Sequence, residues 1–307
     1  MRIFVTGATG LVGRRIVRRL HERGDQVVIL TRRADYAGQL FANSVAIVEG
    51  DPMRPGDWMK AVADCDAVIH LAGENVFARR WNADFKKLLR ESRILSTQNV
   101  VEALRRQPRR ADGQAKALVN ASAIGYYGPR DDEELNEDSA AGSDFLAQLC
   151  VEWEQAARAA ESAGVRVAWV RVGVVLDQEG GALAKLLTPF RLGAGGPVAS
   201  GRQWMSWIHY ADLVSLFLLA VENVQARGAL NGTAPNPVTN REFSKALGRV
   251  LHRPSFVPTP ALALRVALGE VANLITTGQR VLPHRALSLR HSFQYPTLDA
   301  ALAQILN

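Results

Sequence analysis

The chain has 307 residues, of which 48% are hydrophobic and 22% are charged. This length suits one large α/β domain or two fused domains, and the composition excludes a disordered protein and a collagen-like repeat. The formal net charge of +7 is compatible either with a nucleic-acid partner or with small anionic ligands.

Apolar runs along the chain are too short to cross a membrane. The longest extends from Leu213 to Val221, against the roughly 18 residues that a span needs. Met1 and Arg2 lead directly into the apolar residues Ile3–Val5, without a separate cleavable leader. We therefore expect a cytoplasmic protein with no membrane as a partner.

The cysteines and the arginines give little sign of a metal or a nucleic acid. Cys65 and Cys150 are too few for a disulfide scaffold, and neither has a His or Cys neighbour at metal-ligand spacing. The arginines at 14, 15, 18 and 19 have helical spacing, which is typical of a solvated helix face. We expect no metal, no disulfide and no nucleic-acid partner.

Strand-length apolar runs alternate with helical periodicity in the first half of the chain. The predicted strands are 3–5, 26–30, 45–48, 67–71, 117–120 and 165–170, and the predicted helices are roughly 11–24, 55–64, 82–106, 144–162 and 181–192. This alternation predicts an α/β fold of the Rossmann type, a doubly wound parallel sheet covered on both faces.

From about Gly193 the pattern changes to short elements separated by glycine and proline. We predict a dinucleotide-binding domain over residues 1–192, with strand and helix contributions from about 211–235. A smaller C-terminal lobe on the substrate side would consist mainly of residues 193–307.

A glycine-rich turn joins the first predicted strand to the first predicted helix. Gly7 permits the tight turn, Gly10 lets a pyrophosphate approach the backbone, and Gly13 lets the helix pack close to the strand. A bare turn without a ligand would have the same glycines, but the strand–turn–helix context favours a dinucleotide. The expected contacts are Gly7, Thr9, Gly10, Leu11, Val12 and Gly13.

The second predicted strand ends in Thr31-Arg32-Arg33, without the acidic residue that usually holds the ribose 2′-hydroxyl of NAD. Thr31 offers a hydroxyl, and Arg32 offers a charged planar donor that suits a 2′-phosphate. The sequence therefore favours NADP(H). The alternative is that Arg32 and Arg33 are solvent-exposed loop charges.

The fourth predicted strand leads into Leu71-Ala72-Gly73, small residues at the sheet edge where ligands of open α/β sheets bind. Close helix packing would also explain them. Arg93, on the long helix that follows, could reach the cofactor or could form a surface ion pair. Further candidates follow in the connecting loop: Glu74, Arg79, Arg80 and Trp81.

With Thr6–Gly13, His70–Gly73 and Ser206–Asp212, the chain resembles the extended short-chain dehydrogenase/reductase superfamily, and within it the atypical "epimerase family" branch, whose members bind NADP(H). The resemblance covers nearly the whole chain and implies a Rossmann fold with the branch's own tail at about 258–306. It also implies cofactor contacts from Thr31, Arg32, Leu71, Ala72, Arg93 and Val175. The chain departs from the branch at Arg290–Phe293, where a glycine beside the aromatic residue is usual.

The usual catalytic pair of this superfamily is missing. A Tyr and a Lys four residues apart share one helix face, so that the ammonium lowers the pKa of the phenol. Aligned on Glu154, these two positions hold Leu146 and Cys150. The usual catalytic hydroxyl falls on Ala123, one residue from Ser122, which would point to the opposite face of a strand. Ser122 reaches the nicotinamide if the strand has ended there, or else caps the local backbone.

The remaining polar residues give candidates for proton transfer and for substrate binding. The candidate proton donors are Tyr126, Tyr127, Ser122, Glu74 and His209. The candidate substrate contacts, beside Arg79, Arg80 and Trp81, are Arg202, Trp204 and Trp207, since aromatic faces with a guanidinium suit a nucleotide, a sugar or an aromatic acid. The alternative for Trp207 is the core of a short strand.

Two functions stay open. One is an NADP(H)-dependent oxidoreductase or epimerase/dehydratase-like enzyme with a non-standard acid/base, acting on a small-molecule substrate that the sequence does not identify. The other is a non-catalytic NADP(H)-binding redox sensor or regulatory module. Either would be a monomer or a homodimer.

Overall fold

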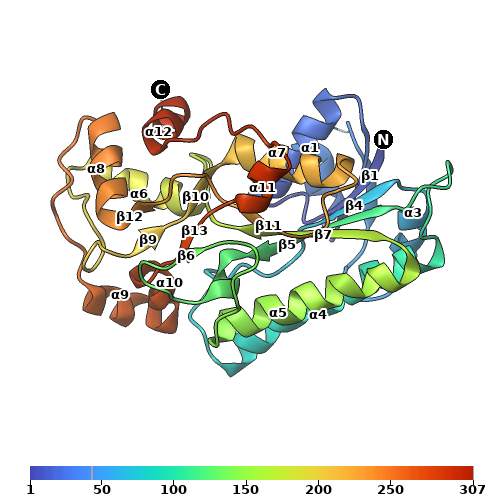
Figure 1. Ribbon diagram of the computed structural model, residues 1–307, viewed down its shortest axis with the longest axis horizontal. Helices are drawn as coiled ribbons and strands as arrows, with labels where there is room; N and C mark the ends of the chain where they lie inside the picture. Colours follow the sequence, from blue (N-terminus) through green and yellow to red (C-terminus); the bar gives the residue numbers. More distant parts are fainter. Residues whose placement is uncertain (43, 307) are drawn as a thin grey trace.

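The computed structural model describes residues 1–42 and 44–306, and its centre is a seven-stranded sheet (Figure 1). The strand order is β11-β7-β5-β4-β1-β2-β3, and every pairing in it is parallel. The strands are β1 (Arg2–Thr6), β2 (Gln26–Thr31), β3 (Ala46–Glu49), β4 (Ala67–His70), β5 (Ala117–Ala123), β7 (Arg166–Val172) and β11 (Gly228–Gly232).

Helices cover both faces of this sheet, as the predicted doubly wound architecture requires. One face packs against α1 (Leu11–Glu22), α2 (Ala34–Leu40) and α7 (Tyr210–Glu222). The other packs against α3 (Trp58–Ala63), α4 (Ala83–Arg106) and α5 (Phe145–Arg158). Helices α4 and α5 run along the lower side of Figure 1. The predicted Rossmann-type fold is confirmed.

The chain order of the strands reverses between β1 and β4. Strands β2 and β3 lie on one side of β1, and β4, β5, β7 and β11 lie on the other. In open α/β sheets such a switch point leaves a crevice beyond the carboxyl ends of the strands, where ligands bind. The fold thus directs attention to the turns after β1 and β4.

A second lobe is built around its own apolar core. It contains β8 (Val174–Leu176), α6 (Gly181–Arg191), β9 (Trp204–Met205), β10 (Trp207–His209), β12 (Val238–Thr239), α8 (Asn240–Val250) and α12 (Leu298–Leu306). The remaining elements are β6 (Glu134–Leu135), α9 (Ala261–Leu268), α10 (Asn273–Thr276), β13 (Arg280–Val281), α11 (His284–Ser288) and the 3-10 turns η1 (Ile124–Tyr127), η2 (Ala159–Ala163) and η3 (Gly269–Ala272). Strand β11 joins the main sheet from this half of the chain.

Element ends differ from the predictions where capping decides them. The helix expected over 144–162 ends at Arg158 and continues as the 3-10 turn η2, which stops before Gly164 at a φ of +82°. The helix expected over 55–64 covers only Trp58–Ala63. Among the helices that the structure describes, none is long and apolar enough to span a bilayer.

Candidate functional site

The turn after β1 presses directly against the chain that leaves β4. Gly7 has a φ of +67°, and a Cβ there would lie 2.8 Å from the carbonyl carbon of Leu71. A Cβ on Gly13 would lie 2.2 Å from the carbonyl oxygen of Gly7. Both glycines are therefore required for this close approach, as the motif predicts.

The N-terminus of α1 faces this turn without a competing side chain. Gly10 is its N-cap, no side chain caps the helix, and its first turn contains no acidic residue. The free backbone N–H groups and the helix dipole favour an anion at this position. A pyrophosphate fits this arrangement.

The sheet face toward α4 and α5 changes character along the strands. Its inner positions are apolar and belong to one core cluster: Phe4, Val68, Leu118 and Val167. Two or four residues further on, the same face carries buried polar side chains: Thr6, His70, Asn120, Ser122 and Arg171. A polar layer therefore lies under the carboxyl edge, directly beneath the predicted cofactor.

One part of this layer connects the two loops of the crevice. The Thr6 hydroxyl accepts hydrogen bonds from the backbone N–H groups of Leu71 and Ala72, both at 3.2 Å, and lies 2.6 Å from Nδ1 of His70. Nε2 of His70 lies 3.2 Å from the hydroxyl of Ser96, which donates to the Ser92 carbonyl at 2.6 Å. All these groups are satisfied when Thr6 donates to a neutral His70 that carries its proton on Nε2. Burial supports the neutral form, because it lowers the pKa of His70 to about 3.

Arg93 lies beside the turn after β4. Its Cγ would be 3.2 Å from a Cβ on Gly73, its Nη1 donates to the Leu89 carbonyl at 3.0 Å, and its guanidinium lies 5.1 Å from the Trp153 ring. Burial lowers its pKa. Among the described residues no carboxylate lies within 4.0 Å, so the alternative of a surface ion pair is wrong.

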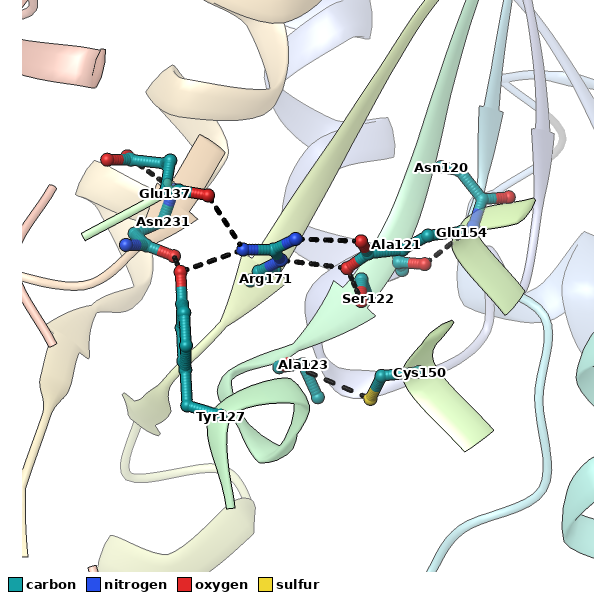
Figure 2. A network of polar contacts seen from close by, with 10 residues as sticks. All are labelled: Asn120, Ala121, Ser122, Ala123, Tyr127, Glu137, Cys150, Glu154, Arg171 and Asn231. Atoms are coloured by element: carbon teal, nitrogen blue, oxygen red, sulfur yellow. Dashed lines mark hydrogen bonds and ion pairs between the residues drawn. The ribbon is translucent and has the colours of Figure 1, made fainter. Parts of the chain in front are cut away.

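A second network fixes the end of β5 (Figure 2). Ser122 donates to Oε1 of Glu154 at 2.7 Å, and Arg171 donates to both oxygens of Glu154 at 2.8 and 2.9 Å. Arg171 also donates to the Tyr127 hydroxyl at 2.9 Å, which in turn donates to Asn231 at 2.7 Å. Burial raises the pKa of Tyr127 to about 12, so this phenol is a poor acid/base.

This network corrects the expectations for Ser122. Strand β5 extends to Ala123, so it has not ended at Ser122, and the hydroxyl donates to the Glu154 side chain rather than capping the backbone. Ser122 is almost completely buried. It therefore holds Glu154 and is not free to reach a nicotinamide.

The positions of the usual catalytic pair hold no acid or base. Leu146 packs over η1, within 3.5 Å of the Cβ position of Gly125. The Cys150 thiol is buried and donates to the Ala123 carbonyl at 3.7 Å, and burial raises its pKa to about 12. Leu146 has no proton to transfer, and burial disfavours proton transfer by Cys150.

Two of the five predicted proton donors keep an uncommitted side chain. His209 is buried, with Nε2 2.7 Å from the Gln304 amide oxygen, so it is committed like Ser122 and Tyr127. Tyr126 is half-buried in η1, its ring 3.4 Å from the guanidinium carbon of Arg171. Its hydroxyl has no hydrogen-bond partner in the described part of the chain, and neither does the half-buried carboxylate of Glu74.

The predicted substrate residues separate into two groups. Arg79 stacks on Phe85 at 4.5 Å, Arg80 donates to the Val266 carbonyl, and Trp81 donates to the Val76 carbonyl at 2.9 Å. This loop therefore bridges the edge of β4 and α9. The indole of Trp204 donates to Asp132 at 2.7 Å, and Arg202 is exposed.

The expectation for Trp207 is wrong. Its side chain is fully buried in β10, and its indole donates to the Asn236 carbonyl at 3.0 Å. Trp207 belongs to the core of the second lobe, as the alternative stated.

The end of β2 carries an arginine that is not in an ion pair within the described part of the chain. Arg32 is exposed and has no carboxylate partner among residues 1–42 and 44–306, whereas Arg33 lies 4.6 Å over the Tyr36 ring. The Thr31 hydroxyl accepts from the Arg33 backbone at 3.1 Å. Val175, in β8, lines a small hollow together with Leu11 and Val12 of the first turn of α1.

Comparison with known proteins gives matches over the full chain. The profile of the NAD-dependent epimerase/dehydratase family matches residues 3–231, and that of a domain of unknown function matches residues 259–305. A chloroplastic epimerase family protein SDR39U1 homolog from Arabidopsis thaliana is 42% identical over 310 residues, which cover 100% of this chain and 87% of the relative.

Solved structures of epimerase-type proteins also superpose on this chain. A crystal structure of the human epimerase family protein SDR39U1 with NADPH superposes with a TM-score of 0.86 at 35% identity, covering 99% of both chains. A UDP-glucose 4-epimerase from Thermotoga maritima has a TM-score of 0.77 at 16% identity, covering 99% of this chain and 97% of that one, a likeness of fold alone.

Proposed function

The chain belongs to the NAD-dependent epimerase/dehydratase family, and from that premise we propose that it binds NADP(H) at the crevice between β1 and β4. The observation that carries the proposal is the contact between the Gly7 turn and Leu71, which leaves the open N-terminus of α1 facing the crevice. The human relative crystallised with NADPH supports the same cofactor.

Selection of NADP(H) over NAD(H) falls to Arg32. It is exposed at the end of β2, where the adenosine ribose of a bound dinucleotide lies in this fold. A guanidinium contact with a 2′-phosphate contributes about 1.5 to 3 kcal/mol, roughly tenfold or more in affinity. Thr31 contributes a shorter polar group to the same position.

The test is a fluorescence titration of NADPH and NADH against Arg32→Ala. We expect NADPH binding to weaken by about tenfold or more and NADH binding to change little. Arg33→Ala is the matched control, because this arginine is adjacent but stacks on Tyr36. Equal losses for both cofactors would show that Arg32 is structural.

For chemistry, we propose an oxidoreductase or epimerase-like reaction in which Tyr126 transfers the proton. Tyr126 lies at the carboxyl end of β5, keeps a free hydroxyl and stacks on a guanidinium that Glu154 holds in place. Without the usual Tyr and Lys, acid/base help worth roughly 10² to 10⁴ in rate is reduced or lost. We therefore expect little or no turnover of ordinary nucleotide sugars.

The second candidate, a non-catalytic NADP(H) sensor, is favoured by the apolar or buried side chains at Leu146 and Cys150. Incubation with a carbonyl and nucleotide-sugar panel separates the two: NADPH absorbance reports a net reduction, and product analysis by NMR reports an epimerisation, which returns the hydride and leaves the absorbance unchanged. Activity that Tyr126→Phe abolishes while NADPH binding persists supports the enzyme. Tight binding without turnover on any member supports the sensor.

A further inference from the structure

Two segments, in and directly after the elements of the second lobe, carry cations and no acids. Residues 180–211 contain Lys185, Arg191 and Arg202, residues 243–269 contain Lys245, Arg249, Arg253 and Arg265, and neither segment contains Asp or Glu. The two segments lie side by side. Val257 donates to the Gly195 carbonyl at 3.1 Å, and the Arg253 side chain donates to the Arg191 carbonyl at 3.0 Å.

These cations are largely unneutralised. Arg249 lies 3.5 Å from Asp299, and none of the other six has a carboxylate within 4.0 Å in the part of the chain that the structure describes. The surface therefore presents a local excess of positive charge, to which an anionic partner is attracted.

Large apolar side chains protrude from the same segments. Leu192 is 79% exposed, Phe256 is 76% exposed, and Leu262 and Val266 of α9 are 72% and 69% exposed. Leu262 and Val266 are four residues apart and share one side of the helix. Helix α9 contains no buried residue.

The protruding side chains belong to segments at one end of the molecule. Residues 251–260 connect α8 to α9 at the left edge of Figure 1, away from the central sheet. We define the lobe edge as residues 191–193, 253–257 and α9. Exposed apolar groups beside a cationic surface of this kind mark interaction sites.

The exposure of these side chains decides the class of partner. An apolar side chain with about seven-tenths of its surface free stands out from its neighbours rather than lining a groove, so a protein partner would have to supply matching holes. Of the four protruding side chains, only Phe256 can stack on a base, which disfavours a nucleic acid. A bilayer interface accepts protruding apolar groups of any arrangement and supplies negative charge from its headgroups.

We propose that the lobe edge docks on the surface of anionic lipid bilayers. Leu192, Phe256, Leu262 and Val266 enter the headgroup boundary, while Arg253 and Arg265 contact lipid phosphates. This differs from the expectation, drawn from the short apolar runs, that a membrane is no partner. That reasoning concerns spanning segments, whereas here the chain lies on the surface.

The test is co-sedimentation of the full chain with vesicles of phosphatidylcholine alone and with vesicles containing a third phosphatidylglycerol. We expect binding to the anionic vesicles only, weakened by salt because the contact between exposed charges is screened. Leu262→Ser with Val266→Ser, and separately Arg253→Glu with Arg265→Glu, should each reduce the partition coefficient about tenfold or more. Both variants alter exposed residues, and intact NADPH binding serves as the check of folding.

Val224→Ser and Arg18→Glu are the matched controls. Val224 is 68% exposed and Arg18 is exposed on α1, and both lie outside the lobe edge. We expect neither to change vesicle binding. Absence of wild-type binding to anionic vesicles, or equal losses for control and lobe-edge variants, would overturn the proposal. Binding to duplex DNA without binding to vesicles would assign the surface to a nucleic acid instead.

Discussion

The two edges of the central sheet both contain buried cations, but in different surroundings. At the amino edge, Arg166 donates to the Ala220 and Val221 carbonyls at the end of α7 and to the Ala226 carbonyl in the connection to β11. Lys116 donates to the Val62 and Ala63 carbonyls at the end of α3. These cations meet the negative ends of helix dipoles. Among the described residues, the contacts of both side chains are with backbone carbonyls of the fold itself.

At the carboxyl edge the polar groups form networks that reach the crevice. Arg171 is neutralised by Glu154 and still contacts the ring of Tyr126, and the Thr6–His70 pair orients the backbone of Leu71 and Ala72. The comparison teaches that burial of charge alone does not indicate function. What distinguishes the carboxyl edge, where we propose that the cofactor binds, is a network that extends from buried groups to the half-buried Tyr126.

The largest effect is expected from breaking the carboxyl-edge ion pair. Arg171→Met leaves the Glu154 carboxylate buried without its partner, which should lower the free energy of unfolding by about 3 to 5 kcal/mol. Chemical denaturation measures the loss. The double variant with Glu154→Leu should recover most of it, and Arg158→Met, at an exposed pair, should change little. A loss below about 1 kcal/mol would show that the pair is dispensable.

A smaller effect is expected at the amino edge. Arg166→Met removes a buried cation from three backbone carbonyls, two of them in the last turn of α7, and should cost about 2 to 3 kcal/mol of unfolding free energy. NADPH affinity should not change, because the site lies at the opposite edge. Arg105→Met is the control, since Arg105 contacts the Ala159 carbonyl from an exposed position. A weakened NADPH affinity would remove the distinction between the edges.

Acid should destabilise the protein through His70. Burial lowers its pKa from the ordinary 6.5 in the unfolded chain to about 3 in the folded protein. Below pH 6.5 the unfolded chain binds a proton that the folded protein does not, so the free energy of unfolding falls with pH until about pH 3. Between neutral pH and about pH 5, this residue alone accounts for a loss of ~2 kcal/mol. Denaturation of wild type and His70→Gln at both pH values tests this. An equally steep loss in the variant would assign the effect to other groups.

The sequence predicted the elements better than it predicted the networks. Apolar alternation located the early strands, and the glycine spacing located the turn at Gly7. Strand β11 was anticipated only as part of a contribution from about 211–235, and it was not located within that range because its sequence, Gly-Ala-Leu-Asn-Gly, contains no β-branched residue. The interruption of an apolar face by His70 and Asn120 was a usable signal.

The contacts between networks needed coordinates. Glu154 and Arg171 lie on different elements, and no spacing rule joins a helix residue to a strand residue 17 positions later. Likewise, the commitment of Ser122 to Glu154 depends on where β5 ends, which is settled by pairing with β7. Local patterns set which groups reach the carboxyl edge, and packing sets which of them stay free.

The smallest effect, and the sharpest test of the carboxyl edge, comes from Thr6. Its hydroxyl accepts hydrogen bonds from two backbone N–H groups and is hydrogen-bonded to His70, so it fixes the turn against which a bound dinucleotide would lie. Thr6→Val keeps the shape but removes the hydroxyl, and we expect NADPH affinity to fall about tenfold, equivalent to ~1.4 kcal/mol.

Thr6→Ser separates the hydroxyl from the side-chain volume. Serine keeps the hydrogen-bonding group and loses only a methyl, so it should retain near-normal NADPH affinity by fluorescence titration. A purely structural role predicts the reverse order, because valine preserves the packing of a buried β-strand end and serine leaves a small void. If Thr6→Ser binds NADPH more weakly than Thr6→Val, the Thr6–His70 pair stabilises the fold without positioning the cofactor, and the carboxyl edge would then resemble the amino edge.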